Sequence, residues 1–147
     1  MKGKVLAVVV LAVVGLAVLV SGRGAQAFSH SDLAIDNVFE GINSGDVEMA
    51  VTEFAEGATY ENLVRKESYT GLSEIRKVLD GMHRPGRRYD IVAVQTNGDT
   101  LTARVEVSDR GHVWGTEIIE AVVNQDGSLQ SFTVESIRLE LWRIGRK

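Results

Sequence analysis

Three polar side chains, those of Tyr60, Asn62 and Glu120, are the best candidates for chemistry in this sequence. Tyr60 and Asn62 stand two residues apart on an expected strand, so their side chains share one strand face. Glu120 lies on a later expected strand. The residues that share its face by alternation are Trp114, Thr116 and Ile118. If that face lined an apolar pocket, burial would raise the pKa of the Glu120 carboxyl and let it act as an acid or a base near neutral pH.

Each candidate also has a structural interpretation. Glu120 could form a salt bridge with Arg104 or Arg138, or face solvent, and this interpretation is favoured. Asn62 could orient a ligand carbonyl or a water, or satisfy backbone groups at the end of its strand. Tyr60 and Trp114 could stack on a ligand, but large aromatic side chains more often fill the core.

Other reactive residues form no recognisable site. His30, His83 and His112 are scattered and the chain has no cysteine, so we expect no metal site and no bound cofactor. Ser108, Asp109 and His112 are close in sequence, but no nucleophile turn accompanies them.

One basic cluster, residues 84–88, follows a predicted helix and contains Arg84, Arg87 and Arg88. It could hold a ligand carboxylate or phosphate near the mouth of a pocket. We favour a solvated loop, which is the usual role of a charged run.

The elements that would position these residues follow from hydrophobic periodicity. Apolar residues recur at helical spacing in 31–44, in a segment from 46 to about 57 and in 71–83, and Pro85 prevents the last helix from continuing. Alternating or β-branched residues predict five strands at 58–64, 89–96, 101–108, 112–123 and 129–142. Short Asn/Asp/Gly turns join the last four strands into an antiparallel meander. The order indicates one α+β domain, with helices covering one sheet face.

The segment 45–79, GDVEMAVTEFAEGATYENLVRKESYTGLSEIRKVL, places a short helix, a strand and a second helix in a characteristic order. The strongest motifs are Asn43–Asp46, Phe54–Tyr60 and Gly71–Leu79. This order resembles the nuclear transport factor 2-like superfamily, and within it the ketosteroid isomerase and SnoaL-like cyclase branch. The resemblance implies a cone-shaped, cystatin-like fold in which a curved antiparallel sheet wraps around three helices. It also implies an apolar pocket at the open end and a possible homodimer through the sheet.

The resemblance also places the family's catalytic positions. The aspartate base of the steroid isomerases falls on Asn62, the tyrosine on Val38 and the later acid approximately on Glu120. An amide cannot accept a proton at neutral pH and valine donates no hydrogen bond, so we expect no ketosteroid isomerase activity. With Asn62 and Glu120 facing inward, the implied ligand-binding residues are Val38, Tyr60, Asn62, Trp114, Thr116, Ile118, Glu120, Phe132 and Val134.

Three functions follow as hypotheses. The first is a domain that binds a small, largely apolar molecule in the cone. The second is a lyase, isomerase or cyclase whose acid–base set is centred on Glu120 and assisted by Asn62 and Tyr60. The third is a non-catalytic interaction or dimerisation module that uses the outer surface of the sheet.

The N-terminal residues 1–27 have the pattern of a secretory signal peptide. Lys2 and Lys4 precede an apolar run, Val5–Val20, and Ala25 and Ala27 match a small-residue cleavage site. Because sixteen residues fall short of the roughly 20 that usually span a bilayer, cleavage after Ala27 is favoured over an uncleaved membrane anchor. We therefore expect an exported domain, residues 28–147, in the periplasm or outside the cell.

The charge of that expected domain bears on its partners. All 20 acidic residues follow Ala27 but only 13 of the 16 basic ones do, which leaves a net charge of −7. This balance argues against a nucleic-acid partner, which would require a positive surface. The lack of cysteine means that the core must stabilise the domain without a disulfide.

Overall fold

The computed structural model describes residues 30–139, with side chains from residue 32. Its elements in chain order are α2 (His30–Ser44), α3 (Val47–Val51), β1 (Phe54–Asn62), β2 (Glu67–Thr70), α4 (Leu72–Met82), β3 (Arg87–Asn97), β4 (Thr100–Asp109), β5 (His112–Val123) and β6 (Leu129–Leu139). The expected signal segment, residues 1–27, lies outside the described residues. Within residues 30–139, none of the helices combines the length and the apolar character needed to cross a membrane.

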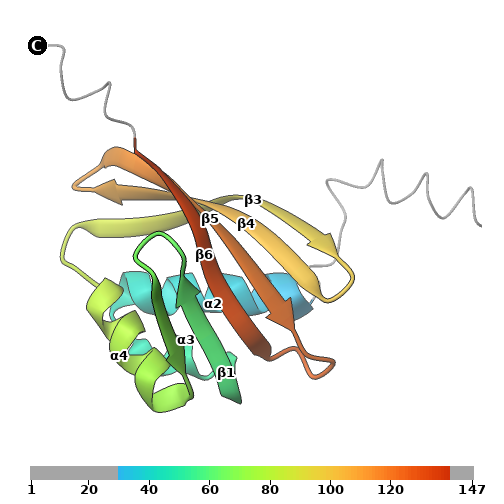
Figure 1. Ribbon diagram of the computed structural model, residues 1–147. Coiled ribbons are helices and arrows are strands. Elements are labelled where there is room, and N and C mark those ends of the chain that lie inside the picture. The colour runs from blue at the N-terminus through green and yellow to red at the C-terminus, as the bar shows by residue number, and fades with distance from the viewer. Residues whose placement is uncertain (1–29, 140–147) are drawn as a thin grey trace, which may run out of the picture.

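The six strands form one mixed sheet in the order β2-β1-β6-β5-β4-β3 (Figure 1). The meander from β3 to β6 is antiparallel, as predicted. The strand pair β1–β6 is parallel and joins the N-terminal hairpin to the meander. Its register sets Tyr60 beside Phe132 and Asn62 beside Val134. This pairing brings the first strand into contact with the last one, across about 70 residues of chain.

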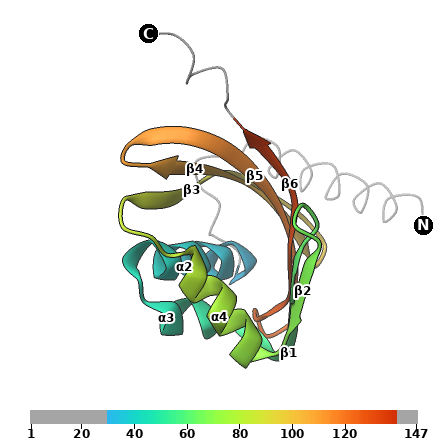
Figure 2. The same ribbon diagram turned by 60° about the vertical axis from the view of Figure 1, so that its left-hand side comes forward.

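The sheet curves around the three helices, which lie on its concave side (Figure 2). The predicted apolar face of α2 is buried: Ile35, Val38, Phe39 and Ile42 are each at most 2% exposed. Ile75 and Leu79 of α4 enter the same core. The α+β fold with a curved sheet wrapped around three helices is therefore confirmed.

The segment between α2 and α4 differs from the prediction in two ways. The second helix is confined to Val47–Val51, and the next strand begins at Phe54, inside the range expected to be helical. The side chain of Asp46 caps this helix as expected, because its Oδ1 accepts from the backbone N–H of Met49 at 3.1 Å. Strand β2, which was not predicted, pairs with β1 in antiparallel register and turns the expected lone strand into a hairpin.

Candidate functional site

A cavity of about 240 Å³ lies on the concave side of the sheet. Its walls come from β1, β2, α4, β3, β5 and β6, together with Arg65 and Arg84 from the connecting turns. The remainder of the cone is filled by a cluster of aromatic rings. Phe132 at its centre lies 6.0 Å from Phe39, 6.0 Å from Phe54 and 5.6 Å from Tyr60, measured between ring centroids. The apolar core and the cavity are therefore neighbours, with Tyr60 belonging to both.

Glu117 supplies the buried carboxyl of this cavity. It lies on β5 between Val105 of β4 and Ile137 of β6 and is only 8% exposed. Its Oε2 is buried and has no hydrogen-bond partner. Burial raises the pKa of the Glu117 carboxyl, and the positive charges of Arg65 and Arg87 partly offset that effect. A carboxyl in this setting can accept or donate a proton near neutral pH.

Two phenols face the same space. Burial, followed by the charge of Glu117, raises the pKa of Tyr60 well above its ordinary value, and a hydrogen bond with Asn62 partly offsets the increase. The pKa of Tyr89 is raised for the same first two reasons. Both phenols therefore stay protonated and can donate a hydrogen bond. Tyr60 is held by Phe132, whose ring stacks on it at an angle of 12°.

Asn62 lies on the cavity wall but has a structural task as well. Its Oδ1 accepts from the backbone N–H of Arg65 at 3.0 Å and so closes the turn between β1 and β2. This is the alternative in which the amide satisfies a backbone group at the strand end. The amide of Asn62 also hydrogen-bonds the Tyr60 hydroxyl. Asn62 therefore holds the β1–β2 turn and the Tyr60 hydroxyl in place, and it also lines the cavity.

The cavity wall is more basic than the sequence suggested. Its charged residues are the cations Arg65, Lys77, Arg84 and Arg87 and the acids Glu67 and Glu117. The cluster at residues 84–88 therefore contributes two side chains to the cavity wall. Arg84 is exposed on the loop, as the favoured interpretation expects, whereas Arg87 is half-buried at the start of β3 and departs from it. Arg88 of that cluster is held at the surface by a salt bridge of 2.7 Å to Asp90.

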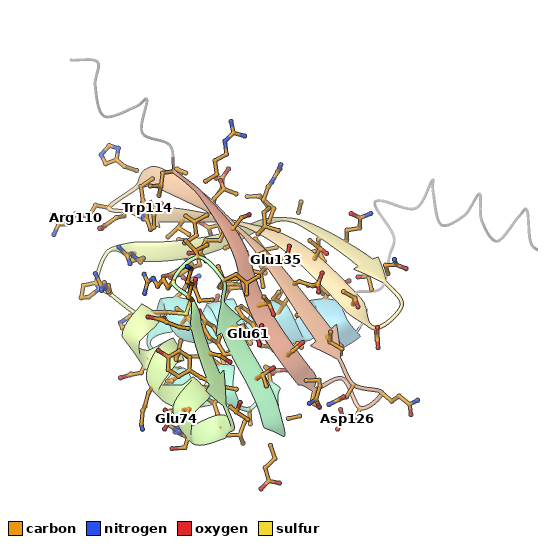
Figure 3. All side chains as sticks on the ribbon, viewed as in Figure 1. Glu61, Glu74, Arg110, Trp114, Asp126 and Glu135 are labelled. Atoms are coloured by element: carbon orange, nitrogen blue, oxygen red, sulfur yellow. The ribbon has the colours of Figure 1, made fainter. Side chains whose placement is uncertain are left out.

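Trp114 lies close to the cavity without lining it. The guanidinium carbon of Arg87 is 5.3 Å from the centroid of the Trp114 ring. Trp114 packs against the core at the end of the sheet, next to the β4–β5 turn that contains Arg110 (Figure 3). Its indole Nε1 and the Arg87 Nε are both buried without a hydrogen-bond partner.

The predicted facing of β5 is wrong for three residues. Glu120, Thr116 and Ile118 lie opposite Thr102, Glu106 and Arg104 of β4 on the outer face of the sheet. The buried face of β5 instead carries Gly115, Glu117, Ile119 and Ala121. The expected facing rested on placing Glu120 inward, but the strand alternates regularly from Gly115 to Ala121 with Glu120 on the outer face. Trp114 does not share that face, because Val107 pairs with Gly115 while Ser108 pairs with Val113, which makes Trp114 the extra residue of a β-bulge. Glu120 makes no salt bridge with Arg104 or Arg138 within the described residues.

Three further predicted ligand-binding residues belong to the core. Val38, Phe132 and Val134 are at most 1% exposed and do not line the cavity. Of the nine predicted residues, the structure brings Tyr60 and Asn62 together at the cavity. Sequence reasoning missed Glu117, Arg65, Tyr69 and Tyr89. A glycine inside a strand often marks a bulge, so Gly115 was an available signal that Trp114 does not share a face with Thr116.

No three His, Cys, Asp or Glu side chains between residues 32 and 139 gather in the way that metal ligands do. The cavity contains only Glu67 and Glu117 of these residue types. Its chemistry therefore rests on one buried carboxyl, phenol donors and guanidinium groups.

Several solved structures resemble this chain in fold. An isomerase proposed for the SnoaL-like family, from Agrobacterium tumefaciens, superposes with a TM-score of 0.63 at 11% identity, covering 74% of this chain and 100% of that one. A proposed polyketide cyclase from Sinorhizobium meliloti gives 0.61 at 18% identity, with 74% and 100% coverage. An NTF2-like protein of unknown function from Cytophaga hutchinsonii gives 0.60 at 10% identity, with 83% and 99% coverage.

At these identities the structural likeness establishes the fold, which is the nuclear transport factor 2-like fold expected from the sequence. A search of curated protein sequences found no match. The sequence profile of the SnoaL-like domain matches residues 35–135, which is most of the described chain. The chain therefore belongs to the SnoaL-like domain family.

Proposed function

We propose that this chain binds a small organic molecule in the cavity beside α4. Membership of the SnoaL-like family supports a ligand-binding or isomerase/cyclase role in general. The observation that carries the proposal is the Oε2 of Glu117, a buried acceptor on the cavity wall that no protein group satisfies. An unsatisfied buried polar atom costs about 1–3 kcal/mol, and a ligand donor at this position would recover that cost.

The walls define what the ligand must offer. Tyr69, Val78, Met82 and Ile137 provide carbon surface for an apolar body. Glu117, Tyr60 and the guanidinium groups provide polar contacts, so the ligand is more polar than the sequence alone suggested. The cavity is also smaller than the 300–1,000 Å³ typical of sites for drug-sized ligands. A single-ring molecule fits such a volume better than a steroid.

The binding proposal is tested by native mass spectrometry of the chain purified without denaturant, before and after organic extraction. We expect an added mass that extraction removes. Glu117→Gln should reduce the occupied fraction, while Glu120→Gln, on the outer face of the same strand, should leave it unchanged. An empty wild-type protein that also gains no thermal stability from any member of a library of single-ring compounds would contradict the proposal.

A second candidate function is proton transfer, with Glu117 in the role that the sequence assigned to Glu120. The specific observation in its favour is the raised pKa of a buried carboxyl close to two protonated phenols. The ionised Glu117 would take a proton from the carbon next to a ligand carbonyl, and the electron pair would move to that oxygen as an enolate. Tyr60 would donate a hydrogen bond to the enolate, and Glu117 would return the proton to another carbon.

Proton transfer is tested by incubating the protein with small carbonyl compounds in heavy water and following loss of the C–H signal by NMR. We expect Glu117→Gln to slow the exchange by about 100-fold or more, the usual contribution of a general base. Glu120→Gln is the control. Equal rates for wild type and Glu117→Gln would eliminate this candidate. Ketosteroid isomerase activity is still not expected, because Asn62 and Val38 occupy the family's base and tyrosine positions.

We further propose that the domain is exported and that residues 1–27 are removed. The support is the sequence pattern of that segment. N-terminal sequencing of the protein recovered from outside the cytoplasm should begin at Phe28, and an intact Met1 would contradict cleavage. The mass measured for the native protein also tests the possible homodimer through the sheet.

A further inference from the structure

The cavity is a local excess of positive charge in an acidic chain. The whole sequence has 20 acidic and 16 basic residues, yet four cations and two acids line this cavity. Lys77 is paired with Glu74 of its own helix at 2.8 Å. Arg65, Arg84 and Arg87 form no salt bridge within residues 32–139. Three guanidinium groups around one small space therefore lack a carboxylate at contact distance.

Arg87 is the most constrained of these three cations. It is half-buried at the start of β3, and its guanidinium lies over the Trp114 ring at 5.3 Å. Its Nε is buried with no acceptor. A buried charged donor without an acceptor is costly, and a planar guanidinium matches the two oxygens of a carboxylate. The Trp114 ring lies against that guanidinium, so we assign Trp114 the role of a positioning residue.

The two acids on the cavity wall do not cancel the positive charge that an anionic ligand would meet. Burial raises the pKa of Glu117, which disfavours its negative charge, although the positive charges of Arg65 and Arg87 oppose that effect. Glu67 is exposed on the edge strand β2, where water screens its charge. Arg65 and Arg84 are exposed as well, so the half-buried Arg87 is the cation of the wall whose charge water screens least.

We infer that the ligand is a small, single-ring organic acid whose carboxylate is held by Arg87, with Arg65 as the second cation and the ring placed among the cavity tyrosines. The inference rests on the proposed binding function and narrows it to one class of ligand. The cavity volume of about 240 Å³ favours one ring. One guanidinium group can donate hydrogen bonds to both oxygens of one carboxylate, so Arg87 suits a singly charged acid.

The test compares acids with their neutral isosteres. A panel of single-ring carboxylates, led by benzoate, is titrated into the full-length protein by calorimetry, in parallel with the matching amides and with inorganic phosphate. We expect the best acid to bind at least about tenfold more tightly than its amide, because hydrogen bonds to charged groups are the stronger ones. Arg87→Gln should remove that preference, and Arg87→Lys should restore only part of it. Circular dichroism checks that both variants are folded.

Two variants of Trp114 test whether this residue positions Arg87 or only stabilises the fold. Trp114→Leu should lower the acid-to-amide affinity ratio while amide binding is kept, and Trp114→Phe should largely restore the ratio. Arg104→Gln, on the outer face of the sheet, should change nothing.

The outcomes separate this inference from the proposed function. Amides that bind as tightly as their acids would overturn the inference and leave small-molecule binding intact. Binding of phosphate without any carboxylate would overturn the carboxylate assignment. Failure of both acids and amides to bind would overturn the inference, and it would overturn the proposed function as well if the native protein also carries no extractable ligand.

Discussion

Replacing Phe132 by alanine distinguishes a core residue from a ligand-binding one. The sequence placed this ring in the pocket, but the structure buries it completely, among Phe39, Phe54 and Tyr60 at centroid distances of 5.6–6.0 Å. Removal of a buried phenylalanine side chain usually costs about 3–5 kcal/mol. Phe132 lies on β6, which is paired on both sides, so the backbone cannot collapse into the void and the upper part of that range is expected.

That loss is large against a typical domain stability of about 5–15 kcal/mol. It should lower the midpoint of thermal unfolding by at least about 12 °C, since each kcal/mol shifts it by about 4–8 °C in a small domain. Urea unfolding followed by circular dichroism gives the free energy directly. Leu63→Ala, at a residue 53% exposed, is the control and should change stability by no more than about 0.5 kcal/mol. A loss below about 1.5 kcal/mol for Phe132→Ala, together with lost ligand binding, would refute the core assignment.

Three further predictions concern the protonation of Glu117, the backbone conformation of Gly45 and the turn between β1 and β2. Burial raises the folded-state pKa of Glu117 above its ordinary value of 4.5, so wild-type stability falls as pH rises from that value through the folded-state pKa. Glu117→Gln lacks this loss and should gain stability relative to wild type in urea melts over that pH range; a constant difference across pH would contradict the assignment. Gly45→Ala should cost at least about 1–2 kcal/mol, because φ is +79° and the added Cβ would lie 3.1 Å from the His83 Nε2; a neutral effect would contradict that geometry. Asn62→Ala should cost about 1–3 kcal/mol by leaving the Arg65 N–H without its acceptor, and hydrogen exchange at that amide should accelerate; unchanged exchange would count against the bond.

The parts of the fold that the sequence predicts well are those with one buried face. The spacing of Ile35, Val38, Phe39 and Ile42 is unambiguous because the opposite face of that helix is polar. The segment around Phe54 is ambiguous, because Val51 and Phe54 satisfy a helical period while Phe54, Ala58 and Tyr60 are the buried apolar residues of strand β1. The segment from Phe54 forms a strand because it pairs with β6, which lies far away in the sequence.

The site was harder to predict, because β5 carries apolar residues on both faces. Ile118 and Val122 point one way and Ile119 and Ala121 the other, so hydrophobic alternation does not choose between Glu117 and Glu120. The pairing of β5 with β4 and β6 in the curved sheet determines which face is buried, and with it the identity of the buried carboxyl. The guanidinium groups could not be foreseen for another reason: Arg65, Arg84 and Arg87 come from separate turns and strands, and only the folded chain brings them to one cavity.

The resemblance placed the candidate residues on β1 and β5, which both line the cavity, but it selected Glu120 where the structure buries Glu117. The structure also gives Asn62, at the family's base position, a role of its own. An amide at residue 62 is used in the β1–β2 turn, where its oxygen accepts from a backbone N–H that an aspartate could also satisfy. An ionised aspartate there would add a negative charge beside the Tyr60 hydroxyl, whose pKa is already raised by burial and by the charge of Glu117. A neutral Asn62 keeps Glu117 the only buried carboxyl among residues 32–139. Glu117 on β5 is therefore the buried carboxyl on which the proposed proton transfer rests, and position 62 of β1 offers no second carboxyl to replace it.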